Sequence, residues 1–233
     1  MDNKIVDVSH LTVTYGDTTV VNNISFTVYQ HDVIVILGPN GGGKTTLLKA
    51  LVGLVPYKGT IAWHTQSIGY LPPPEAIFRT RIPSLTVQDF FSLKGASVES
   101  VKHMIHEVGL QDSIRNKPIS TLSTGQFQRM MLAWVCINKP AVLLLDEPTA
   151  GIDVGGQETI FSLLHRLWKE WKLTIIVITH NAHIIWKHAT KVLCINKDLI
   201  CFDTPEKALN ADVLKHIYGT EVSFYEHKHL FSE

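Results

Sequence analysis

The stretch GPNGGGKTT, at positions 38–46, has a residue pattern that can bind phosphate. It fits the pattern G-x-x-x-x-G-K-[ST], in which glycines let backbone N–H groups wrap around phosphate oxygens. A helix starting here would add the partial positive charge of its N-terminus. Lys44 would reach the outer phosphates of a nucleotide, and the Thr45 hydroxyl would bind Mg²⁺. A glycine-rich turn without a ligand is the alternative interpretation, and the apolar stretch before the motif argues against it.

A pair of carboxylates ends a second apolar stretch, AVLLLDEP, at positions 141–148. Phosphoryl transfer depends on positioned charges and an oriented nucleophile more than on covalent chemistry. Asp146 would therefore hold the Mg²⁺ shell, and Glu147 would polarise the attacking water. An acidic corner between a strand and a loop would explain the pair if it stood alone, but the phosphate motif favours the catalytic interpretation.

The stretch LSTGQFQRM, at positions 122–130, matches a helix capping box. Ser123 would be the N-cap, Gln126 the third helical residue, and Leu122 with Phe127 the hydrophobic staple. A well-capped helix explains this stretch by itself. A helix start is also a site for anions, yet no phosphate for it is obvious within one chain.

The order of apolar residues along the chain predicts the strands and helices that hold these motifs. Short, continuous apolar runs predict buried parallel strands, and they occupy residues 32–38, 141–147 and 173–180. Predicted helices follow at residues 44–54, at 157–171 and, shorter, after 180. Parallel strands bind ligands beyond their carboxyl ends, so Gly38, Asp146 and His180 are expected to converge on one edge of a sheet.

The remaining chain predicts two further parts. Residues 5–28 alternate apolar and polar side chains, which indicates a half-exposed antiparallel sheet. Residues 86–137 have helical spacing of apolar positions, which indicates a helical insert. We expect a single domain over residues 1–233, with an inserted helical lobe at approximately residues 75–137.

Composition narrows the class of protein. Lys+Arg and Asp+Glu both number 21, so the formal net charge is zero, which argues against nucleic acid as a general partner. No leader pattern or membrane-length apolar run is apparent, which predicts a soluble cytosolic chain. Cys136, Cys194 and Cys201 are an odd number without C-x-x-C spacing, and we predict buried free thiols in a reducing cytosol.

The motifs GPNGGGKTT, LSTGQ, VLLLDEPTAGID and ITH, in that order, resemble the nucleotide-binding subunit of ATP-binding-cassette (ABC) transporters. The resemblance covers nearly the whole chain. It implies an α/β P-loop NTPase fold with a RecA-like parallel sheet core, an N-terminal antiparallel β lobe and an inserted helical subdomain. It also implies an ATPase that uses ATP and Mg²⁺.

Site residues follow from the resemblance position by position. Tyr15 would stack on adenine, although a core tyrosine is the ordinary alternative. The nucleotide phosphates would contact the loop residues Gly38, Pro39, Asn40, Gly41, Gly42, Gly43, Lys44, Thr45 and Thr46. Thr45 and Asp146 would bind Mg²⁺. Lys44, Glu147 and His180 would act in catalysis, with His180 contacting the γ-phosphate.

The resemblance further implies partners. Two copies would pair head to tail, with Ser123, Gly125 and Gln126 of one copy facing the γ-phosphate held by the other. Asp153 would lie at the seam of this dimer. Integral membrane permease subunits and, indirectly, a substrate-binding protein would complete a transporter, with this chain peripheral on the cytoplasmic face of the inner membrane. An apolar segment at residues 76–93 could receive a helix of the permease, unless it packs in the core.

Softer stretches resemble the ATPases of zinc-type metal importers, with manganese and iron importers as alternatives. They lie at residues 82–91, 151–157, 192–206 and 216–219. His227 and His229 could bind metal, but a polar tail is the favoured explanation, since two histidines do not complete a zinc shell. Soluble ABC ATPases that act on DNA or ribosomes form another class, which usually carries paired cassettes or long coiled-coil inserts.

Two positions depart from the family pattern. The signature usually reads LSGGQ, and Thr124 replaces its first glycine. The family places a glutamine that meets the metal and the attacking water where this chain has Pro73, within GYLPPPEAIF. These departures keep open a third possibility, a cassette impaired in hydrolysis that uses ATP as a clamp.

Overall fold

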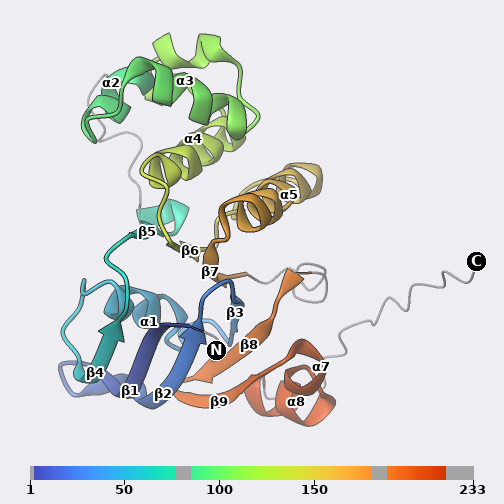
Figure 1. The fold of residues 1–233 in the computed structure, drawn as a ribbon. Helices are drawn as coiled ribbons and strands as arrows, with labels where there is room; N and C mark the ends of the chain where they lie inside the picture. The colour runs from blue at the N-terminus through green and yellow to red at the C-terminus, as the bar shows by residue number, and fades with distance from the viewer. Residues whose placement is uncertain (1–2, 77–84, 180–187, 219–233) are drawn as a thin grey trace, which may run out of the picture.

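Two β-sheets organise the chain in the computed structural model, which describes residues 3–76, 85–179 and 188–218 (Figure 1). One is a three-stranded antiparallel sheet with strand order β2-β1-β4. The other has six strands in the order β5-β6-β7-β3-β8-β9. Both sheets and the helices around them match the fold class that the motifs imply, and the fold prediction is confirmed.

The antiparallel sheet is built from long alternating strands. β1 spans Lys4–Tyr15 and pairs on one side with β2, Thr18–Tyr29, and on the other with β4, Lys58–Trp63. Alternation of buried and exposed residues along β1 and β2 follows from the two-residue period of a strand. The apolar face therefore packs inward, as predicted for residues 5–28.

The six-stranded sheet contains the three strands that lead to the predicted site residues. Its centre consists of β3 (Val33–Leu37), β6 (Val142–Asp146) and β7 (Thr174–Ile178), and every residue of these strands is buried. β5 (Ile68–Leu71) and β8 (Lys191–Asn196) extend the parallel set. β9 (Asp198–Asp203) returns antiparallel to β8. The three strands predicted at residues 32–38, 141–147 and 173–180 are confirmed within two residues at each end.

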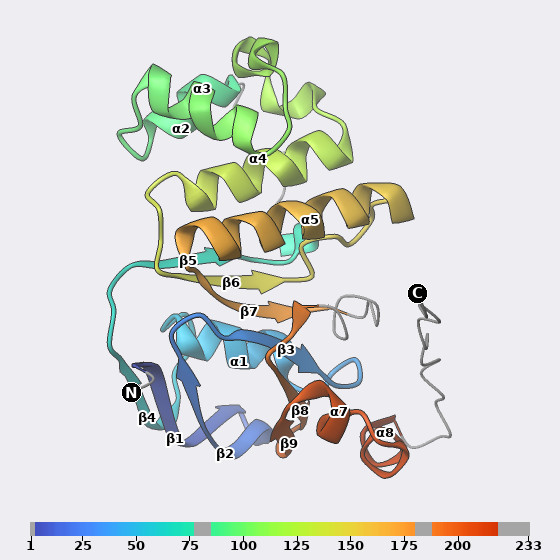
Figure 2. The same ribbon diagram turned by 45° about the vertical axis from the view of Figure 1, so that its right-hand side comes forward.

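Each face of this sheet carries its own hydrophobic cluster, because successive side chains of a strand point to opposite faces. Ile34, Ile36 and Leu144 join the face covered by α1 (Lys44–Leu51) and the antiparallel sheet. The opposite face packs against α5 (Val154–Trp171) and the helical insert. Figure 2 shows α1 between the two sheets and α5 on the far side of the parallel strands.

The helical insert lies between β5 and β6 in the chain. Its α-helices are α2 (Val87–Ser92), α3 (Val98–Glu107) and α4 (Thr124–Cys136). Short 3-10 helices occupy Pro74–Ala76, Asp112–Asn116 and Ile119–Thr121. The chain described after β9 forms α7 (Pro205–Ala208) and α8 (Ala211–Tyr218).

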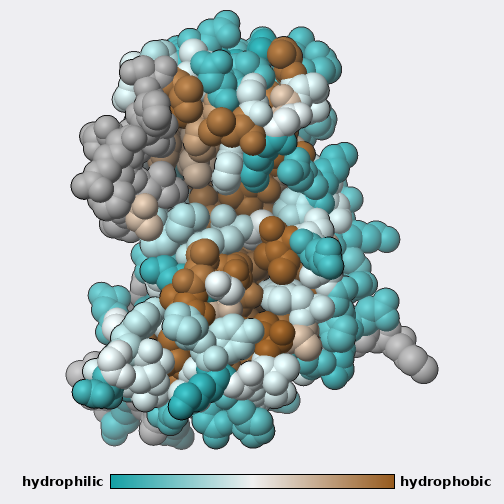
Figure 3. Space-filling model, turned by 90° about the vertical axis from the view of Figure 1, so that its left-hand side faces the viewer, coloured by the Kyte–Doolittle hydropathy of each residue, from teal (hydrophilic) through white to brown (hydrophobic). Residues whose placement is uncertain are grey.

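An open hollow of about 690 Å³ lies beside β5, at the edge of the parallel sheet. Residues of β5, Lys94 after α2, and Trp134 with Val135 near the end of α4 line it. Hydrophobic surface gathers between the insert and the antiparallel lobe on this side of the molecule (Figure 3). Lys94 Nζ donates to the Trp134 carbonyl oxygen at 2.8 Å and lies 3.7 Å from the centre of the Trp134 ring.

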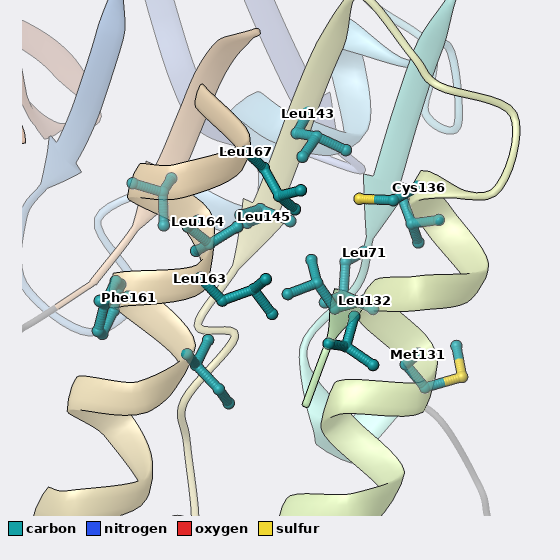
Figure 4. Packing of buried hydrophobic residues seen from close by; sticks show 14 of the residues in the cluster. Leu71, Met131, Leu132, Cys136, Leu143, Leu145, Phe161, Leu163, Leu164 and Leu167 are labelled. Carbon is teal, nitrogen blue, oxygen red and sulfur yellow. The ribbon is translucent and has the colours of Figure 1, made fainter. Parts of the chain in front are cut away.

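The end of α4 is fixed to the sheet by direct packing. Met131, Leu132 and Cys136 of α4 lie near Leu71 of β5, while side chains of α5 approach from the other side (Figure 4). All of these residues belong to one buried cluster. The insert therefore shares its core with the parallel sheet at this end.

The prediction that all three cysteines are free thiols is wrong for two of them. Cys194 of β8 and Cys201 of β9 form a disulfide, with their Cα atoms 4.8 Å apart. The antiparallel register of the two strands places these residues directly opposite each other, although they are seven positions apart in sequence. Cys136 is free and buried, and burial raises the pKa of its thiol to about 12.

None of the helices within the described ranges has both the length and the apolar character that a membrane span requires.

Candidate phosphate-binding site

The glycine-rich loop between β3 and α1 has a backbone that side chains would not permit. Gly41 and Gly43 have φ angles of 78° and 97°, a region that glycine enters without steric cost. A Cβ on Gly43 would also lie 2.6 Å from the Val20 carbonyl oxygen, and one on Gly38 would overlap the Ile195 carbonyl oxygen. Gly38 and Gly43 are thus required because β8 and β2 pack closely against the loop at these two positions.

Hydrogen bonds hold this loop in place. Gly42 N donates to the Pro39 carbonyl oxygen at 3.0 Å, and Lys197 N donates to the Gly42 carbonyl oxygen at 3.0 Å. Asn22 N in turn donates to the Lys197 carbonyl oxygen at 2.8 Å. The loop is therefore fixed from two strands before any ligand arrives.

An open hollow of about 510 Å³ lies over the loop and the start of α1. It is lined by the predicted loop residues 40–46 together with Val20 and Glu147. Gly38 and Pro39 lie beneath, where their carbonyl oxygens face Lys44. Val20 had no signal in the sequence, because its role depends on how β2 packs against the loop.

Lys44 is almost fully buried at the base of the hollow, with 7% of its surface exposed. Its Nζ donates to the carbonyl oxygens of Gly38 at 2.8 Å and Pro39 at 2.9 Å. Burial lowers the pKa of this ammonium, while the charges of Glu147 and Asp146 act in the opposite direction. The ammonium is thus bonded to the loop and lies within the electrostatic reach of both carboxylates.

Asp146 ends β6 and is only 1% exposed. Burial, aided by the charge of Glu147, raises the pKa of its carboxyl; a hydrogen bond from Thr45 and the charges of Lys49 and Lys44 oppose this. Among the described residues its Oδ2 has no hydrogen-bond partner. A hydroxyl and a carboxylate with an open oxygen are the donors that Mg²⁺ prefers, so Thr45 and Asp146 fit this ion.

Glu147 has a φ of 48°, unusual for a residue with a side chain. Its N–H donates to the Ile178 carbonyl oxygen of β7 at 3.1 Å, which holds the backbone in this conformation. A left-handed conformation of this kind costs roughly 1–3 kcal/mol and tends to occur where function requires it. Here it accompanies a carboxylate that borders the hollow.

Tyr15 lies at the end of β1, opposite Thr18 of the same hairpin that supplies Val20 to the hollow. It is 46% exposed and so is not the core tyrosine that the sequence left as an alternative. Its ring therefore offers an exposed aromatic face on the hairpin that supplies Val20 to the hollow.

The predicted capping box at α4 is confirmed. Gln126 N donates to Ser123 Oγ at 3.2 Å, and Ser123 N donates to Gln126 Oε1 at 3.1 Å. Ser123, Gly125 and Gln126 do not line the hollow over the phosphate loop of their own chain. The exposed Thr124 has its methyl group near Gly151, in the loop after β6.

One hydrogen bond connects α4 to the loop after β6, and that loop ends at the cap of α5. Gln128, a buried residue of α4 that the sequence did not single out, donates from Nε2 to the Ala150 carbonyl oxygen at 2.8 Å. Asp153 caps α5 by accepting from Gly156 N at 3.2 Å. His180, His227, His229 and residues 77–84 of the predicted docking segment lie outside the described residues.

A strand, a glycine-rich loop with its lysine, a helix start and a neighbouring acidic strand end together define the nucleotide site of a P-loop NTPase. The chain belongs to the ABC transporter family, whose model matches residues 21–150.

Relatives and solved structures agree with this assignment. The zinc import ATP-binding protein ZnuC of Mannheimia succiniciproducens is 35% identical over 232 residues, covering 97% of this chain and 87% of the relative. ZnuC of Pasteurella multocida is 34% identical with the same coverage. An inward-facing structure described as a metal-chelate type ABC transporter has a TM-score of 0.81 at 25% identity, covering 93% of this chain and 89% of the other.

Proposed function

We propose that this chain hydrolyses ATP to power import of a divalent metal ion, with zinc as the favoured cargo. The observation that carries the ATPase part is the convergence of Lys44, Asp146 and Glu147 beside one preformed phosphate loop. The zinc part is supported by similarity to ZnuC proteins along nearly the full chain. Manganese and iron are the alternative cargoes.

In this proposal each residue has a distinct task. The loop N–H groups and Lys44 bind the β- and γ-phosphates, while Tyr15 stacks on adenine. Thr45 and Asp146 hold Mg²⁺, which when bound neutralises charge on the phosphate oxygens. Glu147 accepts a hydrogen bond from the attacking water and orients it toward the γ-phosphate.

A second copy of the chain would complete the site. Ser123, Gly125 and Gln126 of one copy would face the γ-phosphate held by the other, and Asp153 would lie at the seam. This arrangement is supported by the exposure of Ser123 and Asp153 in the single chain. His180 is proposed to contact the γ-phosphate on the basis of the family resemblance.

Permease subunits would bind the side of the molecule that carries the hollow between the insert and β5. Polar residues and Trp134 line the hollow, and Leu93, next to Lys94 in the chain, is 69% exposed, a mixture that suits an amphipathic helix. Such an assembly would place the chain on the cytoplasmic face of the inner membrane and link it indirectly to a substrate-binding protein.

The Glu147→Gln variant tests the catalytic part. Turnover should fall at least about 100-fold, because loss of a group that orients the nucleophile costs several kcal/mol of transition-state stabilisation. ATP binding should persist, and ATP-bound dimers should accumulate in size-exclusion chromatography. Glu158→Gln, on the exposed side of α5, is the matched control. Full turnover in the Glu147 variant would remove it from this role.

The cargo is tested in the assembled transporter. Uptake of labelled zinc, manganese and iron into proteoliposomes should be ATP-dependent and greatest for zinc. Manganese or iron uptake exceeding that of zinc would replace the favoured cargo. Wild-type ATP binding without any turnover would instead support the hydrolysis-impaired cassette that Pro73 and Thr124 keep open.

A further inference from the structure

Two buried oxygen atoms lie in the same part of the structure, and neither has a hydrogen-bond partner among the described residues. They are Tyr70 Oη on β5 and Asp146 Oδ2 on β6. Such atoms are few in folded proteins, and each costs about 1–3 kcal/mol when left unpaired. The Asp146 oxygen is explained by the proposed Mg²⁺ site, but the Tyr70 hydroxyl is not.

The register of the two strands places these side chains on one face. β5 and β6 are parallel, with Tyr70 opposite Leu144 and Leu71 opposite Leu145. Because side chains alternate, Tyr70, Leu144 and Asp146 all point toward α1. Tyr70 and Leu144 indeed belong to the hydrophobic cluster on that side of the sheet.

Tyr70 and Asp146 are therefore diagonal neighbours, a separation that a long aromatic side chain spans. The electrostatics agree with this proximity. Burial raises the pKa of the Tyr70 hydroxyl to about 12, and the negative charge of Asp146 adds to the effect. A tyrosine hydroxyl has one O–H group with which to donate a hydrogen bond.

We propose that Tyr70 is a positioning residue for the Mg²⁺ site, whose hydroxyl donates a hydrogen bond to one water that in turn donates to Asp146 Oδ2. This inference rests on the proposed function. This water contact holds the carboxylate in place near the Thr45 hydroxyl, and a second lone pair of Oδ2 stays open to the metal. Partners of this kind fix the orientation of metal ligands, and their loss typically costs 10–100-fold in metal affinity.

No other side chain of β5 could take this part. Ile68, Gly69 and Leu71 carry no polar side-chain atom, and neither do the prolines at positions 72–74 that follow. A purely structural tyrosine would be replaced by phenylalanine without loss, because the ring fills the same space. The unpaired hydroxyl would even make phenylalanine the more stable choice in the nucleotide-free protein.

Tyr70→Phe separates the two roles. Mn²⁺ binding to the ATP-loaded protein, measured by electron paramagnetic resonance, should weaken about 10-fold. The Mg²⁺ concentration that gives half-maximal hydrolysis should rise by a similar factor. The melting temperature of the nucleotide-free protein and its affinity for metal-free ATP should not fall. Tyr57→Phe, at an exposed tyrosine before β4, should change none of these quantities.

A double-mutant cycle gives the second measurement. In an Asp146→Asn background, Tyr70→Phe should cause no further loss of Mn²⁺ affinity, because the group that it positions is gone. Unchanged Mn²⁺ affinity in the single variant would overturn the proposal. A Tyr70→Phe protein that fails to fold would also overturn it, since the hydroxyl would then serve the fold. Failure of the wild-type chain to bind ATP and Mn²⁺ would instead contradict the proposed function.

Discussion

Two helix starts in this molecule, those of α1 and α4, solve the same physical problem in opposite ways. Each leaves backbone N–H groups without partners inside the helix. At α1 the cap is Gly43, and no side chain bonds to the exposed amides. At α4 the Ser123 and Gln126 side chains cap each other's backbone.

The start of α1 is therefore an open site, with backbone donors left for a ligand, whereas the start of α4 is a satisfied site, whose donors already have side-chain partners. The start of α1 offers free donors and a buried lysine, so a single chain can bind phosphate there. The start of α4 is stable without a ligand and contributes to the fold of the insert. In the proposed dimer it would meet phosphate only when a second copy brings one. Substitutions at the two helix starts should therefore differ in their effects on ATP affinity, stability and dimerisation.

Lys44→Ala should abolish the open site. The variant would lack the charged hydrogen bonds from the Lys44 ammonium to phosphate, each worth about 1.5–3 kcal/mol. The ATP affinity of the single chain should therefore fall on the order of 100-fold or more, measured by isothermal titration calorimetry. Lys58→Ala, on exposed β4, is the control. Unchanged ATP affinity in the Lys44 variant would contradict the assignment of the phosphate loop.

Ser123→Ala should affect the satisfied site instead. Loss of an N-cap costs about 1 kcal/mol, which lowers the melting temperature by roughly 2–4 °C in a protein of this size. Single-chain ATP affinity should not change, but ATP-dependent dimers of the Glu147→Gln protein should weaken. Ser97→Ala removes the comparable cap of α3 and should lose stability alone. Equal dimerisation in both variants would place Ser123 outside the dimer contact.

Thr124→Gly should give the smallest effect. Thr124 is exposed at the first position of α4, where its side chain would stand near the phosphate of a partner. Removing it should raise steady-state turnover by a factor of about three, or ~0.6 kcal/mol. Thr124→Ser should give an intermediate rate. A lower rate in the glycine variant would show that the threonine assists closure.

Sequence patterns predicted the parts of the site that depend on local backbone. The apolar runs ending at Gly38 and Glu147 are too short for a typical buried helix and are followed by loop residues, which favours buried strands. The capping box was predictable because its hydrogen bonds join residues three positions apart.

Features that depend on strand register could not be predicted in this way. The facing of Tyr70 and Asp146 arises from pairing of strands that are about seventy residues apart in sequence. The Cys194–Cys201 disulfide likewise depends on the β8–β9 register. The left-handed backbone of Glu147, which follows β6, is held by a hydrogen bond from its N–H to the carbonyl oxygen of Ile178 on β7.

The hydrogen bonds of Lys44 to its own loop have a consequence for the entropy of nucleotide binding. A free lysine side chain has about 2 kcal/mol of rotamer entropy to lose when it is ordered. In this chain the two carbonyl contacts order Lys44 during folding. An arriving phosphate therefore exchanges acceptors around an ammonium that is already fixed, and the ordering cost falls on the stability of the protein and not on its affinity for the nucleotide.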